Sequence, residues 1–178
     1  EAAFNIDKLV GNNGKIFTRG TGIREYIQSP ETIDCRNSGT TARLLTGHWS
    51  GQKFSTRLDG YESLKKRPMD RVKKPLEEIG AKIETNNGRM PVDIFPSEIK
   101  GGSIDLSSPS AQVKSAIILA ALSGNGELKI NIDKVTRDHT EIMLSYFTEN
   151  IIIEKNCLTV IPDPKIITDQ IEIPNDPS

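Results

Sequence analysis

The chain has 178 residues, 35% of them hydrophobic and 26% charged, a composition typical of a globular protein with one sizeable domain or two small ones. Its formal net charge of −1 argues against a general nucleic-acid-binding protein, and no apolar run approaches membrane-spanning length. Two cysteines, Cys35 and Cys157, are too few for a disulfide framework and lack metal-ligand spacing, so we expect buried thiols in a reducing cytoplasm.

Short elements separated by glycines are predicted before residue 36. Apolar residues at helical spacing predict a helix over residues 2–10. Short strands are expected at 15–19, 25–28 and 32–35, because each of these runs is bounded by glycine, proline or polar residues.

The stretch Asn37-Ser38-Gly39-Thr40-Thr41-Ala42-Arg43 lies where the strand at 32–35 gives way to a predicted helix over 39–50. The first N–H groups of a helix have no partner within it, and such an end attracts anions. Gly39 lets the backbone approach a ligand, and the neighbouring hydroxyls can donate hydrogen bonds. Ser38 is equally suited to an ordinary N-cap, so this stretch alone leaves both interpretations open.

Strands and helices alternate after this turn. The sequence predicts a strand at 53–58 and a helix over 68–79, where Pro68 suits the first helical position. A strand pair is expected at 81–84 and 91–95, joined through a turn rich in asparagine and glycine.

From Gly101 onward the order of elements begins again. Residues 32–35 correspond to 103–106, and the helix over 39–50 corresponds to one ending at Ser123, at an offset of roughly 70 residues. Each unit is predicted to run strand, helix, strand, helix, strand, strand. The sequence therefore indicates an α/β (α+β) fold of repeated βαβαββ units. Because the opening elements are similar to the second half of a unit, we expect the chain to begin partway through a preceding unit.

Polar residues recur at equivalent positions of the two units. Residues 37–43 and 110–114 both lie at strand-to-helix joints, and Arg67 and Arg137 both precede the second helix of their unit. Helix starts, hydroxyls and guanidinium groups that converge would form a pocket for a small, multiply anionic ligand such as a phosphorylated metabolite. Solvated arginines and simple serine caps are the alternative for each position alone. Because four such positions recur at equivalent places in the two units, the pocket is favoured over these separate explanations.

Four motifs resemble, in order, signature stretches of the enolpyruvylshikimate-phosphate synthase (3-phosphoshikimate 1-carboxyvinyltransferase) family. They are residues 37–45 (NSGTTARLL), 59–69 (DGYESLKKRPM), 110–116 (SAQVKSA) and 136–141 (TRDHTE). The resemblance implies an inside-out barrel fold, with two domains of three βαβαββ units each about a pseudo-threefold axis and the active site between the domains.

This chain would then form one incomplete domain of the two-domain enzyme. The expected division is a partial unit over 1–30, a unit over about 31–100, a unit over about 101–170, and the interdomain crossover at 171–178. The second domain of the same enzyme would be its main partner, with no nucleic acid or membrane involved.

For shikimate 3-phosphate, the resemblance implies four binding residues. Ser110 and Thr136 would contact its phosphate, Gln112 would lie at its ring, and Arg137 would also lie at this substrate.

For phosphoenolpyruvate, the resemblance implies that Gly39 lines the pocket in which the herbicide glyphosate competes, and that Arg67 grips the substrate. Arg43 is expected to shape the helix rather than touch a substrate. Ala111 and His139 stand where some members have a serine and a tyrosine, and these departures affect the details of the phosphate and ring contacts.

The implied reaction transfers the enolpyruvyl group of phosphoenolpyruvate to shikimate 3-phosphate and releases phosphate, in the shikimate pathway of aromatic amino acid biosynthesis. The resemblance implies no metal or organic cofactor. The family's lysine of the N-terminal phosphate-binding segment, and the acidic and lysine groups of the opposite domain, have no match here. We therefore assign no catalytic residue to this chain and expect it to bind shikimate 3-phosphate weakly and turn over nothing.

Two alternatives remain. A UDP-N-acetylglucosamine enolpyruvyl transferase-like enzyme shares the fold but usually carries a reactive cysteine in the loop before the Arg-Pro motif, and loop 59–67 has none. Cys35 is expected to be buried rather than nucleophilic. A non-catalytic phosphometabolite-binding module is the other alternative. With only two histidines in the chain, His48 is expected to be structural.

Overall fold

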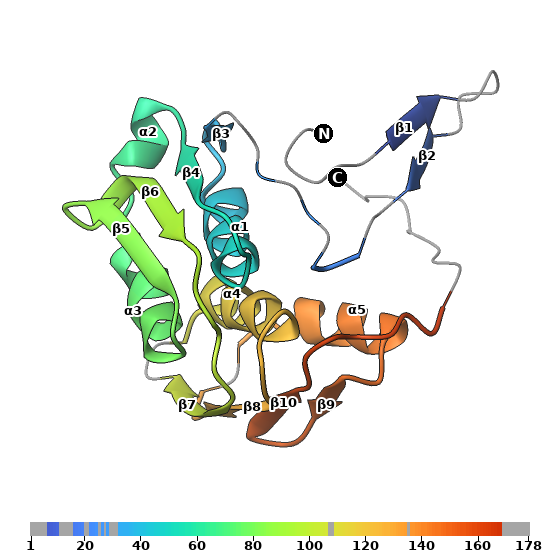
Figure 1. The fold of residues 1–178 in the computed structure, drawn as a ribbon. Helices are drawn as coiled ribbons and strands as arrows, with labels where there is room; N and C mark the ends of the chain where they lie inside the picture. The colour runs from blue at the N-terminus through green and yellow to red at the C-terminus, as the bar shows by residue number, and fades with distance from the viewer. Residues whose placement is uncertain are drawn as a thin grey trace.

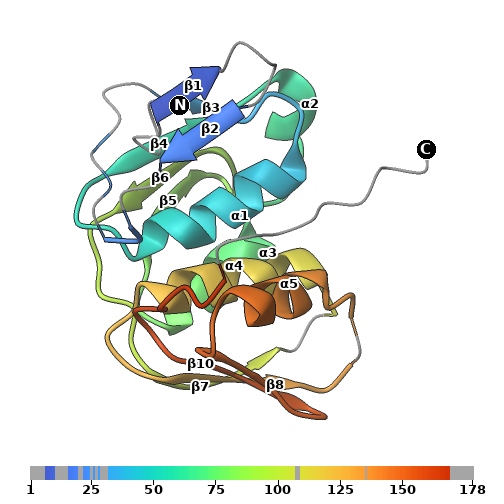
Figure 2. The same cartoon turned by 90° about the vertical axis from the view of Figure 1, so that its right-hand side faces the viewer.

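Two four-stranded sheets enclose a layer of helices between them (Figures 1 and 2). This computed structural model describes residues 7–10, 16–19, 22–24, 26, 28, 32–106, 109–134 and 136–168. A separate hairpin pairs β1 (Asp7–Val10) with β2 (Ile16–Arg19).

The first unit contains β3 (Ile33–Asp34), α1 (Gly39–Ser50), β4 (Thr56–Asp59), α2 (Glu62–Lys65), α3 (Asp70–Glu78), β5 (Lys82–Asn86) and β6 (Arg89–Phe95). The second unit contains β7 (Gly102–Leu106), α4 (Ala111–Leu122), β8 (Leu128–Ile132), α5 (His139–Phe147), β9 (Ile151–Ile153) and β10 (Cys157–Val160).

The two sheets have the same topology. Their strand orders are β3-β4-β6-β5 and β7-β8-β10-β9, so the strands occupy equivalent places in each unit. In both sheets the first two strands are parallel, with Ile33 opposite Leu58 and Ile104 opposite Ile130, and the other pairs are antiparallel. The prediction of a repeated βαβαββ unit is confirmed. Among the described residues neither sheet closes into a barrel.

Some predicted elements were wrong. Residues 7–10 form strand β1 rather than the end of a helix, because a short apolar run fits either period and backbone pairing with β2 decides between them. The rest of that predicted helix, residues 2–6, lies outside the described residues, as do 25 and 27 of the strand expected at 25–28; residues 26 and 28 are not in a strand. Helix α2 was not predicted.

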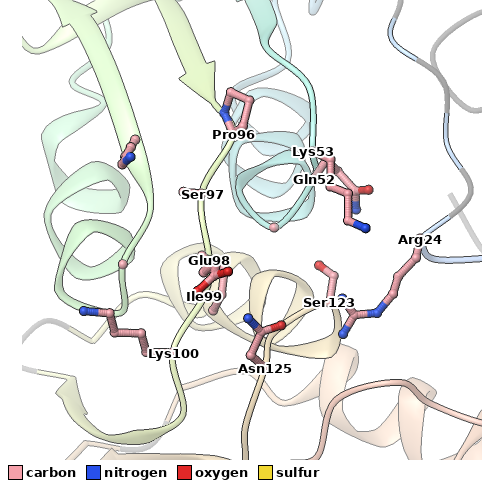
Figure 3. Close-up of a pocket in the computed structure, with 13 residues that line it drawn as sticks. Arg24, Gln52, Lys53, Pro96, Ser97, Glu98, Ile99, Lys100, Ser123 and Asn125 are labelled. Carbon is pink, nitrogen blue, oxygen red and sulfur yellow. The ribbon is translucent and has the colours of Figure 1, made fainter.

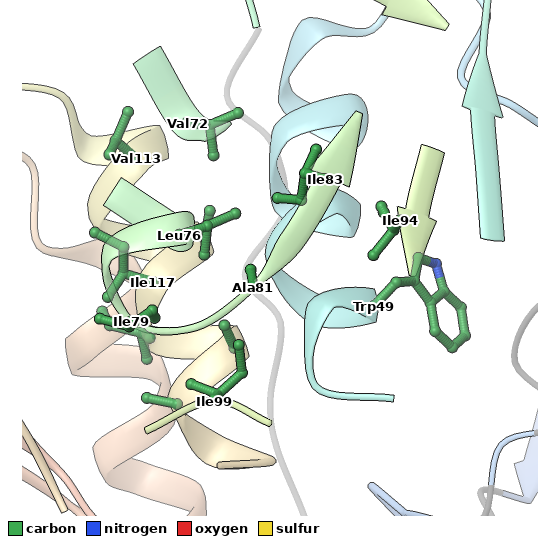
Figure 4. Close-up of a cluster of buried hydrophobic side chains, with 14 of the residues drawn as sticks. Trp49, Val72, Leu76, Ile79, Ala81, Ile83, Ile94, Ile99, Val113 and Ile117 are labelled. Carbon is green, nitrogen blue, oxygen red and sulfur yellow. The ribbon is translucent and has the colours of Figure 1, made fainter. Parts of the chain in front are cut away.

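The central contact of the helix layer is between α1 and α4. Helix α4 is buried on nearly every side, as its run of alanine and isoleucine suggests, and it forms the middle of the core. Figure 4 shows Ile117 of α4 near Leu76 and Ile79 of the first unit, with Ile83 and Ile94 extending the core toward the first sheet. A single core therefore joins the two units.

α1 and α4 run in the same direction. At one end the Gln112 side chain donates to Thr40, and at the other a Cβ on Gly51 would lie 2.4 Å from the Ser123 hydroxyl oxygen. Midway, a Cβ on Gly47 would lie 2.1 Å from the Ala116 carbonyl oxygen, so the two backbones are in direct contact there. The helix N-termini therefore lie side by side.

Gly47→Ala is expected to destabilise the chain by about 2–3 kcal/mol. The added methyl group would clash with the backbone of α4, which cannot move aside as a flexible side chain can. Gly126→Ala is the matched control, since its Cβ would meet its nearest neighbour, the Gly101 Cα, at an ordinary 3.4 Å. Urea unfolding of both variants measures the difference. Equal free energies of unfolding would contradict the close helix contact.

His48 packs in an aromatic cluster at the end of α1. Its ring lies edge-on to Tyr26 and Trp49, with centroid distances of 5.0 and 4.8 Å. Burial lowers the pKa of His48 from 6.5 to about 4. Between these values the unfolded chain takes up a proton that the folded chain does not.

Stability is therefore expected to fall as the pH drops from 6.5 toward 4, with His48 contributing at most about 3 kcal/mol. Urea midpoints measured across this window give the slope. In His48→Gln the slope should be shallower, whatever the overall stability of that variant. An unchanged slope would show that His48 titrates normally in the folded chain.

Candidate functional site

Both central helices begin with a serine cap. The Ser38 hydroxyl oxygen accepts a hydrogen bond from the Thr41 N–H at 3.1 Å, and Ser110 accepts one from the Val113 N–H at 3.4 Å. The local N-cap interpretation therefore holds for both serines. It does not compete with ligand binding, because a serine that accepts a cap bond still has its own O–H to donate.

Arg43 and Gln112 connect the two helix starts. The Arg43 Nη1 donates to Gln112 Oε1 at 2.7 Å, and Gln112 Nε2 donates to the Thr40 hydroxyl at 2.7 Å. These bonds join α1 to a residue 69 positions further along the chain. Two of the sequence motifs thus meet in space.

Arg67 and Arg43 lie over Gly39. A Cβ on Gly39 would be 2.9 Å from Arg67 Nη1 and 3.0 Å from Arg43 Nη1, so a glycine leaves room for both guanidinium groups. Burial, followed by the positive charges of Arg67 and Arg71, lowers the pKa of Arg43. Concentrated positive charge of this kind is stabilised by a bound anion.

The loop that carries Arg67 folds back on the glycine turn. The Tyr61 N–H donates to the Arg36 carbonyl at 2.8 Å, and the Ser63 hydroxyl donates to the Asn37 side chain. This second motif is therefore fixed against the first, which places Arg67 at the start of α1.

A pocket of about 220 Å³ lies between the starts of α1, α4 and α5. It is lined by Thr40, Leu44, Ala111, Gln112, Ser115, Arg137, His139 and Thr140. The structure thus brings Gln112 and Arg137 together.

Ser110 and Thr136 are not among the residues that line this pocket, although each is next in sequence to one that does. Both side chains are partly buried, whereas Arg137 is exposed. The Thr136 hydroxyl lies 3.5 Å from the Arg137 carbonyl oxygen, a long local contact. The two residues expected to contact the phosphate therefore do not line the pocket themselves.

Sequence reasoning missed an ion pair behind this pocket. Lys114 and Glu141 are both buried and form a salt bridge between α4 and the first turn of α5. Beside it, the Ser115 and Thr140 hydroxyls are 2.7 Å apart. All four residues belong to the two later motifs, so the sequence showed which chemical groups were present. It could not predict that two of them would pair across 27 positions.

A larger pocket lies at the opposite end of the helix layer. Its cavity volume is about 550 Å³, and Figure 3 shows Arg24, Lys53, Lys100 and Ser123 around it. Arg24 is already engaged by Asp163 and by the Gly124 carbonyl. The exposed carbonyls at helix C-termini disfavour anions, so this pocket is a poorer phosphate site than the helix starts.

Within the described ranges of the chain, no helix is long and apolar enough to cross a membrane. No three side chains of histidine, cysteine, aspartate or glutamate gather there in a way that could hold a metal ion.

The sequence pattern of the EPSP synthase (3-phosphoshikimate 1-carboxyvinyltransferase) family matches residues 5–178. The chain belongs to the EPSP synthase family. It is 38% identical over 162 residues to the 3-phosphoshikimate 1-carboxyvinyltransferase of Limosilactobacillus fermentum, covering 89% of this chain and 38% of that protein. The corresponding enzyme of Thermodesulfovibrio yellowstonii is 40% identical over 177 residues, covering 98% of this chain and 41% of that protein.

The fold agrees with this membership. EPSP synthase from Acinetobacter baumannii superposes with a TM-score of 0.85 at 38% identity, covering 93% of this chain and 38% of that chain. The present chain thus spans about two fifths of the length of these relatives. Among EPSP synthases it represents a part of the family fold that contains the glycine turn and the Arg-Pro motif.

The cysteines of this EPSP synthase family member differ in their surroundings. Cys35 is buried as expected, and burial, with smaller effects of Asp34 and Asp59, raises the pKa of its thiol to about 11. Cys157 is only half-buried, not fully in the core as predicted, because it is the first residue of β10, an inner strand whose other residues are buried.

Iodoacetamide at pH 7.5 is therefore expected to label Cys157 and to leave Cys35 unmodified until the chain unfolds, because the thiolate is the reactive form. Peptide mass spectrometry of folded and urea-treated samples provides the measurement. Labelling of folded Cys35 at the rate of Cys157 would instead reveal a nucleophilic thiol.

Proposed function

We propose that this chain supplies part of the substrate site of an EPSP synthase, which transfers the enolpyruvyl group of phosphoenolpyruvate to shikimate 3-phosphate. The observation that carries the proposal is the meeting of two helix N-termini beneath the guanidinium groups of Arg67 and Arg43. Family membership supports the choice of substrates. Unpaired N–H groups and fixed cations are the chemistry that binds phosphorylated, carboxylated metabolites.

Gly39 and Arg67 are proposed to bind phosphoenolpyruvate. The absence of a side chain at Gly39 gives a phosphate or carboxylate access to the start of α1, and Arg67 can grip it with two parallel N–H donors. Arg67 is exposed, so it is accessible to a ligand.

Ser110, Gln112, Thr136 and Arg137 are proposed to bind shikimate 3-phosphate. The shared pocket of Gln112 and Arg137, flanked by the two hydroxyl residues, supports this assignment. The hydroxyls and the guanidinium group would meet the phosphate, and the amide would meet a ring oxygen.

In the proposed reaction, a ring hydroxyl of shikimate 3-phosphate loses its proton as its oxygen bonds to the enol carbon of phosphoenolpyruvate, while the methylene carbon takes up a proton as the carbon–carbon double bond becomes a single bond. The resulting tetrahedral intermediate loses a proton and expels phosphate. The residues of this chain hold and neutralise the anionic groups through both steps, including the leaving phosphate. Proton transfer is assigned to the second domain, so we propose that this chain alone has no turnover.

The domain division is part of this proposal. Residues 31–100 and 101–170 are proposed as two units of one domain, supported by their identical strand orders. The partial unit at 1–30 is described only in part, and the crossover at 171–178 lies outside the described residues. The two free cysteines support a reducing, cytoplasmic setting.

Calorimetric titration of the chain with shikimate 3-phosphate is expected to show weak binding, with amide shifts at residues 110–114 and 136–137. Arg137→Ala should weaken this affinity by about 10-fold to 100-fold, the loss typical of one charge-assisted hydrogen bond. Arg57→Ala is the control, because Arg57 is an exposed arginine on β4 that pairs with Asp93.

Two outcomes would contradict the proposal. Binding of UDP-N-acetylglucosamine in place of shikimate 3-phosphate would identify the related enolpyruvyl transferase. Binding of neither compound, nor of phosphoenolpyruvate, would favour a non-catalytic module.

A further inference from the structure

The guanidinium group of Arg43 contacts three separate segments. Nη1 lies 2.7 Å from Gln112 Oε1 and 3.4 Å from the Gly39 carbonyl oxygen, and Nη2 lies 3.4 Å from the Pro68 carbonyl oxygen. These segments are the glycine turn, the start of α4 and the Arg-Pro motif. One side chain thus spans the segments that carry both halves of the proposed substrate site.

The contact with Arg43 determines the orientation of the Gln112 amide. Arginine has only donors, so the amide oxygen must face Arg43 and the amide nitrogen must face the other way. There Nε2 donates one hydrogen to the Thr40 hydroxyl at 2.7 Å. With its oxygen turned toward Arg43 and one N–H given to Thr40, Gln112 has a second N–H left to donate to a ligand in the pocket.

We propose that Arg43 is a positioning residue that presents Gln112 as a donor and therefore selects a substrate oxygen that accepts a hydrogen bond. The proposal rests on the proposed function of the pocket that Gln112 lines. It extends the expectation that Arg43 shapes its helix rather than touching a substrate. The ligand class is a sugar-like ring whose hydroxyl or ether oxygen accepts from Gln112 while an anionic group pairs with Arg137.

A lysine could not replace Arg43 in this role. Its single ammonium nitrogen carries the same charge but cannot lie at hydrogen-bond distance from Gln112 and from Pro68 at once, as the two terminal nitrogens of arginine do. The positive charge of Arg43 and its ability to contact both partners at once can therefore be tested separately.

The first test uses the ligand-free chain and the side-chain NH₂ resonances of Gln112, assigned by their loss in Gln112→Glu. In the wild type the two proton shifts should depart from those of an exposed glutamine, because one proton donates to the Thr40 hydroxyl. Arg43→Lys and Arg43→Met should move both resonances to the values of an exposed glutamine. Unchanged resonances in either folded variant would overturn the proposal.

The second test measures affinity for shikimate 3-phosphate. Arg43→Lys should weaken binding by about tenfold, close to the loss in Arg43→Met, because the span matters more than the charge. Arg71→Met is the matched control: it removes a neighbouring charge that lowers the Arg43 pKa, and should change affinity less than threefold. If Arg43→Lys binds like the wild type, Arg43 acts only as a charge and the proposal fails.

The Gln112→Glu variant tests whether binding needs the N–H donor, in a chain whose stability should be unchanged. A glutamate keeps an oxygen for Arg43, so the unfolding midpoint should be retained, but it has no N–H and should lose about tenfold in affinity. Wild-type affinity in this variant would show that no donor is needed. If the wild-type chain binds no shikimate 3-phosphate, the proposed function fails, while the resonance test still decides the role of Arg43.

Discussion

The backbone contact between α1 and α4 is the constraint on which the rest of the structure depends. At Gly47 the two helices approach until no Cβ fits between them, and this distance brings their first turns within reach of single hydrogen bonds. A wider spacing would leave Gln112 too far from Arg43 and would open the pocket at its base. The site is therefore a product of packing in the core rather than of the polar residues alone.

Charge is distributed unevenly around this contact. Arg43 and Arg67 crowd the start of α1, where neither forms an ion pair with an acidic side chain of the described residues, and burial followed by the charges of Arg67 and Arg71 lowers the pKa of Arg43. Beside α5 the charges are balanced instead, because the positive charge of buried Lys114 is neutralised by buried Glu141. The first arrangement favours an incoming anion, whereas the second fixes α5 in place.

Local signals were sufficient for much of the fold. The helix over 39–50 was predicted with its observed bounds because a serine cap and a glycine mark its two ends, and the duplication was readable from two similar runs of elements. The bond from Arg43 to Gln112 was not readable, since it depends on how two units pack across 69 positions. For the same reason the sequence could predict Ser110 and Thr136 as phosphate contacts but could not show that neither lines the pocket.

The parallel direction of α1 and α4 has an electrostatic consequence. In an antiparallel pair the helix macrodipoles oppose each other, but here they add, so the paired N-termini of α1 and α4 are positive and their paired C-termini negative, most strongly within the first and last turns. That field is a property of the backbone and survives the loss of any one arginine. It adds to the attraction that Arg43 and Arg67 exert on small anions at these N-termini, and that attraction weakens as salt is added.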